Sequence, residues 1–384
     1  MPVSLRAKLA AIDAPKKPSA PAVQPLYIKE TVYPLSDFHH LLDVTGQLLH
    51  LMDGRSYPDP LDPESILYLD TETTGLAHGA GTVAFLIGVG FVQEESFIVR
   101  QYLMRDYSQE SQVLKHLMCL LPDYEVLVTF NGRSFDVPLL QSRLIMNRLD
   151  PECLNIPHVD LLHIARRIFK LRLKHCRLID LEAELFNAPR EDDLPGALVP
   201  QRYFDYLKTG NFSLLTDILE HNAQDIASLG KLLGHMGYMY QKPEQQSMLT
   251  DVYAMGLAFE KRKEFAHACR CYHLATKGKM ASSCYYRLGL IARREKDYRQ
   301  SLENFRQMIK ACPSDHTPWI EMAKIYEHRL KDIESALECT RKAVYILAEP
   351  HLMENPAVQE TQNALQYRYM RLMRKLQGEK RQQP

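Results

Sequence analysis

The chain has 384 residues, of which 46% are hydrophobic and 24% are charged, the composition of a globular protein with two or three domains. Lys plus Arg and Asp plus Glu each total 47, so the formal net charge is zero and no bulk positive surface would attract an anionic polymer. The longest apolar run, residues 83–92, is far shorter than the roughly 20 residues that a membrane helix needs. We therefore expect no membrane contact, and any nucleic-acid contact must be local.

Cysteine usage bears on the cellular compartment. The eight cysteines are scattered and form no Cys-x-x-Cys pair, and residues 1–11 are too short for the apolar segment of a secretory signal. We expect reduced thiols in a cytoplasmic protein.

The first 63 residues are expected to form an N-terminal extension. Residues 14–25 are rich in Pro, Ala and Lys, which is typical of an extended linker. Residues 26–57 carry some helical periodicity, and the prolines of residues 58–63 separate them from the next domain. Whether residues 26–57 pack onto that domain is left open.

Residues 64–240 are expected to form an α/β domain with a mixed sheet and flanking helices. Four stretches rich in β-branched and aromatic residues predict strands: residues 66–69, 82–91, 96–103 and 125–130. Three stretches with helical periodicity predict helices: residues 108–121 with Ser108 as N-cap, residues 137–148 opened by Pro138, and residues 214–233. The region from 158 to 240 is expected to be mostly helical.

Residues 245–384 are expected to be all helical and repetitive. Small residues recur at spacings of 33 and 34, each followed three positions later by a second core residue: Gly256 and Phe259, Gly289 and Ala292, Ala323 and Tyr326. This pattern resembles tetratricopeptide repeats, in which small residues let paired helices approach closely. The third unit has an apparent one-residue insertion before Ala336. An ordinary helical bundle is the alternative.

Two carboxylates stand at the end of the first predicted strand, in the segment LDTETTGL. Asp70 and Glu72 are two residues apart, so on a strand they point to the same face. Two such charges repel unless a proton or cation lies between them, and oxygen-only ligands suit Mg²⁺ or Mn²⁺. By itself this pair is common and indicates a metal only weakly.

A third carboxylate, Asp136, lies after the strand at 125–130 in the segment NGRSFDVPLL. It precedes a predicted helix, so it could instead be an N-cap. Asn131 and Arg133 in the same segment could contact a phosphate or a terminal sugar, or could be exposed turn residues.

The segment HNAQD places His221 and Asp225 one turn apart on the last predicted helix. An imidazole beside a metal-holding carboxylate is well placed to take a proton from water. Alone, such a pair is more often a solvated surface contact.

Taken together, the three segments resemble the three motifs of the DEDD exonucleases in the ribonuclease-H-like superfamily. More narrowly, residues 66–235 are similar to a YprB-like branch of predicted exonucleases. The resemblance implies that four carboxylates hold two divalent ions and that His221 is the general base. Thr71, Asn131 and Arg133 are the candidate substrate contacts. The carboxylates concerned are Asp70, Glu72, Asp136 and Asp225.

One feature departs from that family. Its His-type members usually have four residues between His and Asp, whereas three residues separate His221 from Asp225, which is the spacing of the Tyr-type members. Whether His221 is the base is therefore left open.

The expected function is metal-dependent hydrolysis of single-stranded DNA or RNA from the 3′ end, with the repeats docking a protein partner. One alternative is an adaptor whose repeats carry the function and whose nuclease-like domain is inactive. Another is a phosphodiesterase for short oligonucleotides. The basic stretch at residues 367–384 could hold nucleic acid, or could be a solvated capping helix with a frayed end.

Overall fold

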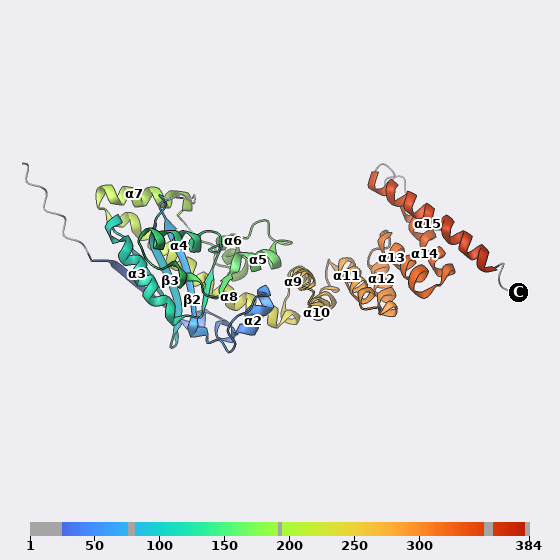
Figure 1. The fold of residues 1–384 in the computed structure, drawn as a ribbon, viewed down its shortest axis with the longest axis horizontal. Helices are drawn as coiled ribbons and strands as arrows, with labels where there is room; N and C mark the ends of the chain where they lie inside the picture. The colour runs from blue at the N-terminus through green and yellow to red at the C-terminus, as the bar shows by residue number, and fades with distance from the viewer. Residues whose placement is uncertain (1–24, 76–80, 191–193, 349–355, 381–384) are drawn as a thin grey trace, which may run out of the picture. The chain divides into compact units, whose positions relative to one another are not determined.

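The computed structural model describes residues 25–75, 81–190, 194–348 and 356–380, so most of the expected linker lies outside the described residues (Figure 1). The chain divides into two compact units. The first comprises residues up to Leu161 together with Leu178–His235, and the second comprises Leu162–Arg177 and the residues from Met236 onward.

The first unit is built on a six-stranded mixed sheet with the order β1-β4-β3-β2-β5-β6. The strands are β1 (Tyr27–Pro34), β2 (Ile66–Thr73), β3 (Ala84–Gln93), β4 (Ser96–Leu103), β5 (Val126–Thr129) and β6 (His158–Asp160). The pairs β1–β4, β3–β4 and β2–β3 are antiparallel, whereas β2–β5 and β5–β6 are parallel. The expected α/β fold with a mixed sheet is confirmed.

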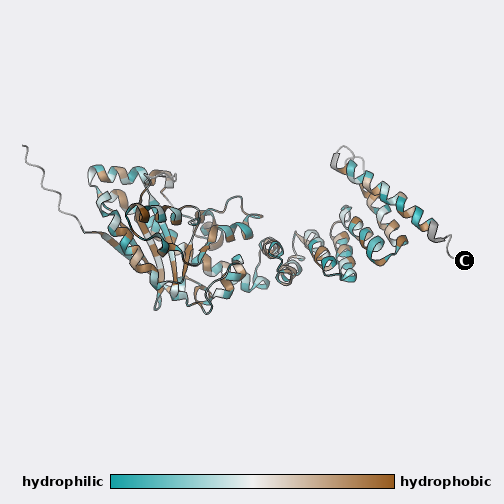
Figure 2. Ribbon diagram, in the orientation of Figure 1, coloured by the Kyte–Doolittle hydropathy of each residue, from teal (hydrophilic) through white to brown (hydrophobic). Residues whose placement is uncertain are grey.

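Strand β3 lies in the middle of the sheet, and nine of its ten residues are buried. Figure 2 shows the strands as mostly hydrophobic, while the surrounding helices carry both hydrophobic and hydrophilic residues. Burial on both faces explains why β3 is a continuous apolar run and not an alternating one.

Strand β1 shows that part of residues 26–57 does pack onto the α/β domain. It pairs with β4 along its whole length, from Tyr27 opposite Leu103 to Pro34 opposite Ser96. The helical pattern expected from residue 26 onward is therefore wrong for β1, whose burial alternates with a period of two. These residues belong to the sheet although the expected domain boundary fell after residue 63.

Helices cover both faces of the sheet. The helices that begin in this unit are α2 (Gly46–Asp53), α3 (Glu110–Leu120), α4 (Asp136–Met146), α6 (Leu178–Phe186), α7 (Val199–Thr209) and α8 (Thr216–Gln241). Helix α8 packs on the face of β3 that carries Gly88 and Gly90. On the opposite face Phe85 stacks on Tyr203 of α7, with ring centroids 4.0 Å apart.

Two local predictions differ from the structure. Ser108 is not the N-cap of α3: Asp106 caps a 3₁₀ turn ahead of the helix, and its carboxylate accepts from the Ser108 amide at 2.8 Å. Strand β6 was missed because three residues within a helical region give no detectable alternation.

The second unit consists of helices. They are α5 (Leu161–Phe169), α9 (Leu249–Lys261), α10 (Phe265–Ala275), α11 (Ala281–Arg294), α12 (Tyr298–Ala311), α13 (Thr317–Ile325), α14 (Ile333–Leu347) and α15 (Pro356–Lys380). A Cβ on Gly256 would lie 2.6 Å from the Tyr272 ring, and one on Gly289 would lie 2.6 Å from Phe305. Small residues therefore do let the paired helices approach, as the repeat pattern predicts.

The third repeat takes up its extra residue in the backbone. Helix α13 continues into a π-helical turn, Tyr326–Leu330, whose i→i+5 hydrogen bonding spans one residue more than that of an α-helix. In this turn the buried Glu327 accepts from three cations of α15: Arg368 at 2.9 Å, Arg371 at 2.7 Å and Lys375 at 2.9 Å. These cations neutralise an internal acid, which favours the capping-helix interpretation of the basic stretch.

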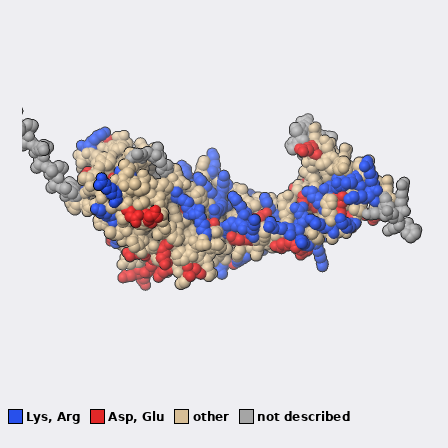
Figure 3. Space-filling model, viewed as in Figure 1, with Lys and Arg blue, Asp and Glu red and all other residues tan. Residues whose placement is uncertain are grey.

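Surface charge, cysteine thiols and helix polarity can be read from the described residues. Figure 3 shows Lys, Arg, Asp and Glu interspersed over the helical repeats on the face in view. All eight cysteines lie in the described residues and are free thiols. Within the described residues, the helices are too short or too polar to cross a membrane.

Candidate active site

The first two predicted carboxylates lie on one face of β2, as their spacing requires. Asp70 is opposite Gly88 and Glu72 is opposite Leu86 on β3, so both side chains are on the face that α8 covers. Asn222 of α8 donates its Nδ2 hydrogen to Asp70 Oδ2 at 2.9 Å. Burial, then the charges of Asp225, Asp136 and Glu72, raise the pKa of Asp70 well above its usual value. The other three predicted carboxylates are thus close enough to Asp70 to disfavour its charge.

Asp136 is the first residue of α4, and its carboxylate faces β2. The N-cap position is Phe135, which makes no side-chain capping bond, so the N-cap alternative does not hold. Thr71 donates its hydroxyl proton to Asp136 Oδ1 at 2.5 Å. Burial raises the pKa of Asp136 to about 6, although the Thr71 bond opposes this shift.

A cavity of about 270 Å³ opens between the end of β2 and the start of α4. Its lining includes Asp70, Thr71, Asn131, Phe135 and Asp136. Phe135 is 45% exposed and lines the cavity beside the carboxylates.

Arg133, an expected substrate contact, is not in this lining. Its guanidinium donates to the main-chain carbonyl of His158. The backbone causes this orientation: the amides of Asn131 and Arg133 donate to the Asp160 carboxylate, at 2.8 and 3.2 Å, and Asn131 has a positive φ of 67°. The turn is thereby fixed to β6, and Asn131 remains at the cavity.

His221 and Asp225 lie side by side on α8. Nε2 of His221 is 3.5 Å from Asp225 Oδ2, and each side chain is 16% exposed. Burial raises the pKa of Asp225, and the nearby His221 and Arg190 oppose that shift.

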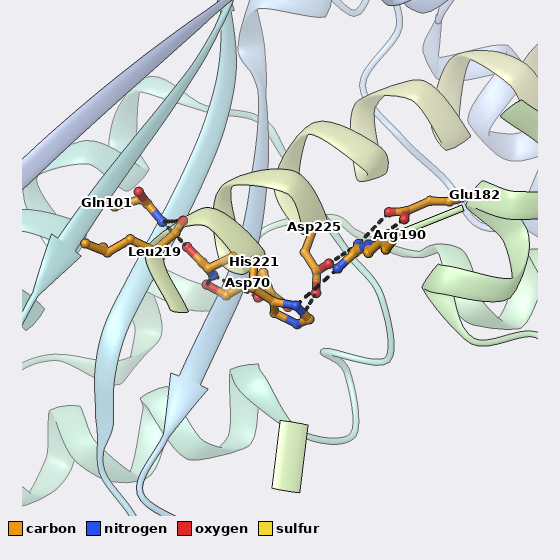
Figure 4. Close-up of polar contacts among 8 residues, drawn as sticks. Asp70, Gln101, Glu182, Arg190, Leu219, His221 and Asp225 are labelled. Carbon is orange, nitrogen blue, oxygen red and sulfur yellow. Dashed lines mark hydrogen bonds and ion pairs between the residues drawn. The ribbon is translucent and has the colours of Figure 1, made fainter. Parts of the chain in front are cut away.

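Arg190 joins this pair from the segment after α6 (Figure 4). Its guanidinium donates to Asp225 Oδ1, and its NH1 group lies 3.2 Å from His221 Nδ1. Glu182 of α6 holds the other side of the guanidinium with two bonds of 2.6 Å. Because a guanidinium only donates, Nδ1 of His221 accepts in this contact and the imidazole proton is on Nε2.

A second set of contacts positions Asp70, also drawn in Figure 4. Gln101 of β4 donates to Asn222 Oδ1 at 2.9 Å and to the Leu219 carbonyl at 2.8 Å. Since Gln101 occupies the carbonyl end of the Asn222 amide, its NH₂ end must face Asp70. Asn222 and Gln101 are both fully buried, so this orientation is fixed.

The donor set suits a hard divalent cation. It consists of carboxylate oxygens without thiols. Burial and then the charges of neighbouring carboxylates raise the pKa of Asp70, and a bound cation would relieve that repulsion. Within the described part of the chain, no three His, Cys, Asp or Glu side chains already converge as ligands. In this conformation Asp225 is bonded to Arg190 and Asp136 to Thr71.

Two protein-family models match parts of the chain. Residues 67–237 match the family model of the RNase H superfamily. These residues form a ribonuclease-H-superfamily domain. Residues 282–315 match the tetratricopeptide repeat, so the predicted YprB-like arrangement of a ribonuclease-H-like domain followed by repeats is confirmed.

Two individual proteins are similar to the chain. It is 29% identical over 335 residues to the uncharacterized protein YprB of Bacillus subtilis (strain 168), which covers 83% of this chain and 80% of that protein. A family B DNA polymerase from Pyrobaculum calidifontis matches with a TM-score of 0.37 and 15% identity, covering 53% of this chain and 30% of the polymerase.

Several residues of the ribonuclease-H-superfamily domain were missed from sequence. Arg190 and Glu182 gave no signal, because an Arg and a Glu eight residues apart are common on any surface. Asp160 belongs to the strand that was missed. The sequence shows Asn222 only as the residue after His221 and gives no sign of its role. Its hydrogen-bond partner Gln101 is 121 residues away.

Gly88 is predicted to be essential for the seating of Asn222. A Cβ there would lie 2.2 Å from Asn222 Oδ1 and 2.3 Å from Ile226 Cδ1. We expect Gly88→Ala to lower the free energy of unfolding by about 1–3 kcal/mol, measured with urea. The matched control is Gly81→Ala, because a Cβ on Gly81 would meet nothing within 4 Å. Equal stability of the two variants would contradict the packing described.

The pKa of Asp136 predicts how stability depends on pH without metal. Its folded value, about 6, exceeds the usual 3.8, so the folded state retains the proton longer and stability falls as pH rises from about 4 to about 6. Asp136→Asn removes this penalty. In EDTA, we expect the melting temperature of the variant relative to wild type to rise by several degrees between pH 4.5 and 7.5.

Comparing the melting temperatures of wild type and Asp136→Asn cancels the pH-dependent contribution of the buried histidines, which both proteins share. The pKa of His158 is lowered to about 4, which destabilises both proteins equally in acid. A difference in melting temperature that is constant with pH would show that Asp136 has an ordinary pKa.

Proposed function

We propose that the protein is a metal-dependent nuclease that hydrolyses phosphodiester bonds, acting as a 3′–5′ exonuclease. The observation that carries the proposal is that carboxylates from α4 and α8 lie close to Asp70 of β2, although these elements are far apart in sequence. Burial raises the pKa of Asp70 most, and the charges of Asp225 and Asp136 raise it further. Such repulsion lowers stability without a cation, so the arrangement is costly unless it serves catalysis.

Asp70, Glu72, Asp136 and Asp225 are the residues that would hold two divalent ions, Mg²⁺ or Mn²⁺. When bound, such ions would lower the pKa of the attacking water and stabilise the leaving oxygen. The protein's own groups set the geometry: Asn222 fixes Asp70, and Thr71 fixes Asp136. Asn131 and Phe135, at the cavity, are proposed to contact the terminal nucleotide.

His221 is the proposed general base. Its Nδ1 accepts from Arg190, and its Nε2 carries the proton and faces Asp225. With the proton on Nε2, the lone pair that can accept a proton is on Nδ1, and Arg190 occupies it. Nδ1 can accept a proton from water only after this contact is broken. Nε2 can do so only after its own proton has moved to Nδ1, which also requires the contact to break. Proton transfer to His221 therefore requires a local rearrangement at Arg190.

Arg133 is not proposed as a substrate contact. Its guanidinium is engaged by the His158 carbonyl and lies outside the cavity lining. Thr71 lines the cavity, but its hydroxyl donates a hydrogen bond to the Asp136 carboxylate. We therefore propose that its main role is to orient that carboxylate.

The repeats are proposed to bind a protein partner, since stacked helical repeats present extended surfaces for binding. Single-stranded nucleic acid is the proposed substrate of the other unit. Zero net charge supports recognition by the local site and not by a general basic surface.

The exonuclease proposal is tested with circular and linear single-stranded DNA of the same sequence in Mn²⁺. An exonuclease degrades the linear strand and leaves the circle intact. A linear strand whose 3′ end is blocked by an inverted nucleotide should also survive. Cleavage of the circle at a rate similar to that of the linear strand would overturn the proposal in favour of an endonuclease.

A further inference from the structure

Arg190 and Glu182 form a buried ion pair beside the proposed metal ligand Asp225. The Arg190 side chain is 4% exposed and that of Glu182 is 3% exposed. The guanidinium makes two parallel bonds to the Glu182 carboxylate, each 2.6 Å long, and this geometry fixes the plane of the fork. The remaining donors of that plane point to α8.

On α8 the guanidinium reaches both members of the His–Asp pair. One NH₂ group bonds Glu182 and Asp225 Oδ1, and the other lies 3.2 Å from His221 Nδ1. Oδ1 of Asp225 is thereby held on the side of Arg190, while Oδ2 lies 3.5 Å from His221 Nε2. The rotamer of Asp225 therefore depends on Arg190, a group outside α8, as well as on His221.

The charge of the pair decides between two roles for Arg190. An unpaired guanidinium beside Asp225 would compete with a divalent cation for that carboxylate. Here Glu182 supplies one negative charge, so the pair is neutral overall and adds hydrogen-bond donors without adding net positive charge. Groups that orient a ligand in this way usually strengthen metal binding, by about 10–100-fold.

We propose that Arg190, held by Glu182, is a positioning residue that orients Asp225 for binding a divalent cation. The inference rests on the proposed function, because it assumes that Asp225 is a metal ligand. The inference adds Glu182 of α6 and Arg190 of the following segment to the site residues that the three sequence motifs supply.

The test measures Mn²⁺ binding to the full-length protein by the electron paramagnetic resonance signal of free Mn²⁺. We expect Arg190→Gln to weaken binding by about tenfold or more. Arg190→Lys should also weaken it, because an ammonium keeps the charge but cannot make the two parallel bonds. The matched control is Arg202→Gln, which breaks a more exposed ion pair with Asp217 in the same unit.

The outcomes separate the possible roles. Unchanged Mn²⁺ affinity with a lowered melting temperature would show that Arg190 is merely structural, and tighter binding would show that it competes with the cation. Either result overturns the proposal. If Arg190→Gln does not fold, Arg190→Lys decides by the same criterion.

Mn²⁺ binding to the Asp70→Asn variant distinguishes a failure of the positioning role from a failure of the proposed metal site. Loss of Mn²⁺ binding in Asp70→Asn with normal binding in Arg190→Gln would refute the positioning role alone. Absence of Mn²⁺ binding in wild type would refute the metal site, and the positioning role with it.

Discussion

Asp70→Asn is expected to abolish hydrolysis while leaving the metal-free protein at least as stable as wild type. The amide keeps the shape of the side chain, and its oxygen can still accept from Asn222 Nδ2. The charge that would bind a cation is lost. We expect turnover to fall by about 10³-fold or more, equivalent to about 4 kcal/mol of transition-state stabilisation.

The stability part of this prediction depends on the pKa of Asp70. Burial and three neighbouring carboxylates raise that pKa, so the ionised form is disfavoured in the folded state. A neutral residue removes the penalty at pH 7–8, where the unfolded chain would be ionised. The melting temperature in EDTA should therefore stay the same or rise, and Mn²⁺ should stabilise wild type but not the variant.

The exposed Asp37 provides the matched control, as Asp37→Asn makes the same chemical change away from the site. It should leave both turnover and the response to Mn²⁺ unaltered. Near-wild-type turnover in Asp70→Asn would mean that the converging carboxylates do not carry the reaction.

His221→Ala is expected to lower turnover by about 10²–10⁴-fold, the usual contribution of a general base. Mn²⁺ affinity should change little, because the proposed metal ligands remain and Arg190 still holds Asp225. Lowered turnover with nearly unchanged Mn²⁺ affinity distinguishes His221→Ala from Arg190→Gln, which is expected to weaken Mn²⁺ binding. Both quantities are measured on the same preparations, with turnover followed at saturating Mn²⁺.

The size of the rate change tests the assignment of the base. A rate change of less than about threefold would show that another group accepts the proton. That result would fit the unusual spacing of His221 and Asp225 in the third motif.

The motif residues could be predicted from sequence because their spacing reflects local geometry. Asp70 and Glu72 share a strand face, and His221 and Asp225 share a helix face, and both relations result from backbone periodicity alone. Gly256 and Gly289 likewise predicted close helix pairs through a fixed repeat.

The contacts that hold the motifs in place could not be predicted in this way. Arg190 reaches Asp225 across 35 residues, and Gln101 reaches Asn222 across 121 residues. Such pairs depend on how β4, α6 and α8 pack, and no periodicity in the sequence encodes that packing. Strand β1 was misread for a related reason: one face is exposed and the other only half-buried, so its alternation is weak.

Metal-dependent shortening of nucleic acid from the 3′ end is the property that the converging carboxylates should confer. The most direct test incubates 5′-labelled single-stranded RNA and DNA of matched sequence with wild type and Asp70→Asn, in Mn²⁺, in Mg²⁺ and in EDTA. We expect a ladder that shortens from the 3′ end with wild type and metal, and none with EDTA or the variant. Intact strands under every condition, with a folded protein that binds Mn²⁺, would contradict the exonuclease assignment and favour a protein-binding adaptor.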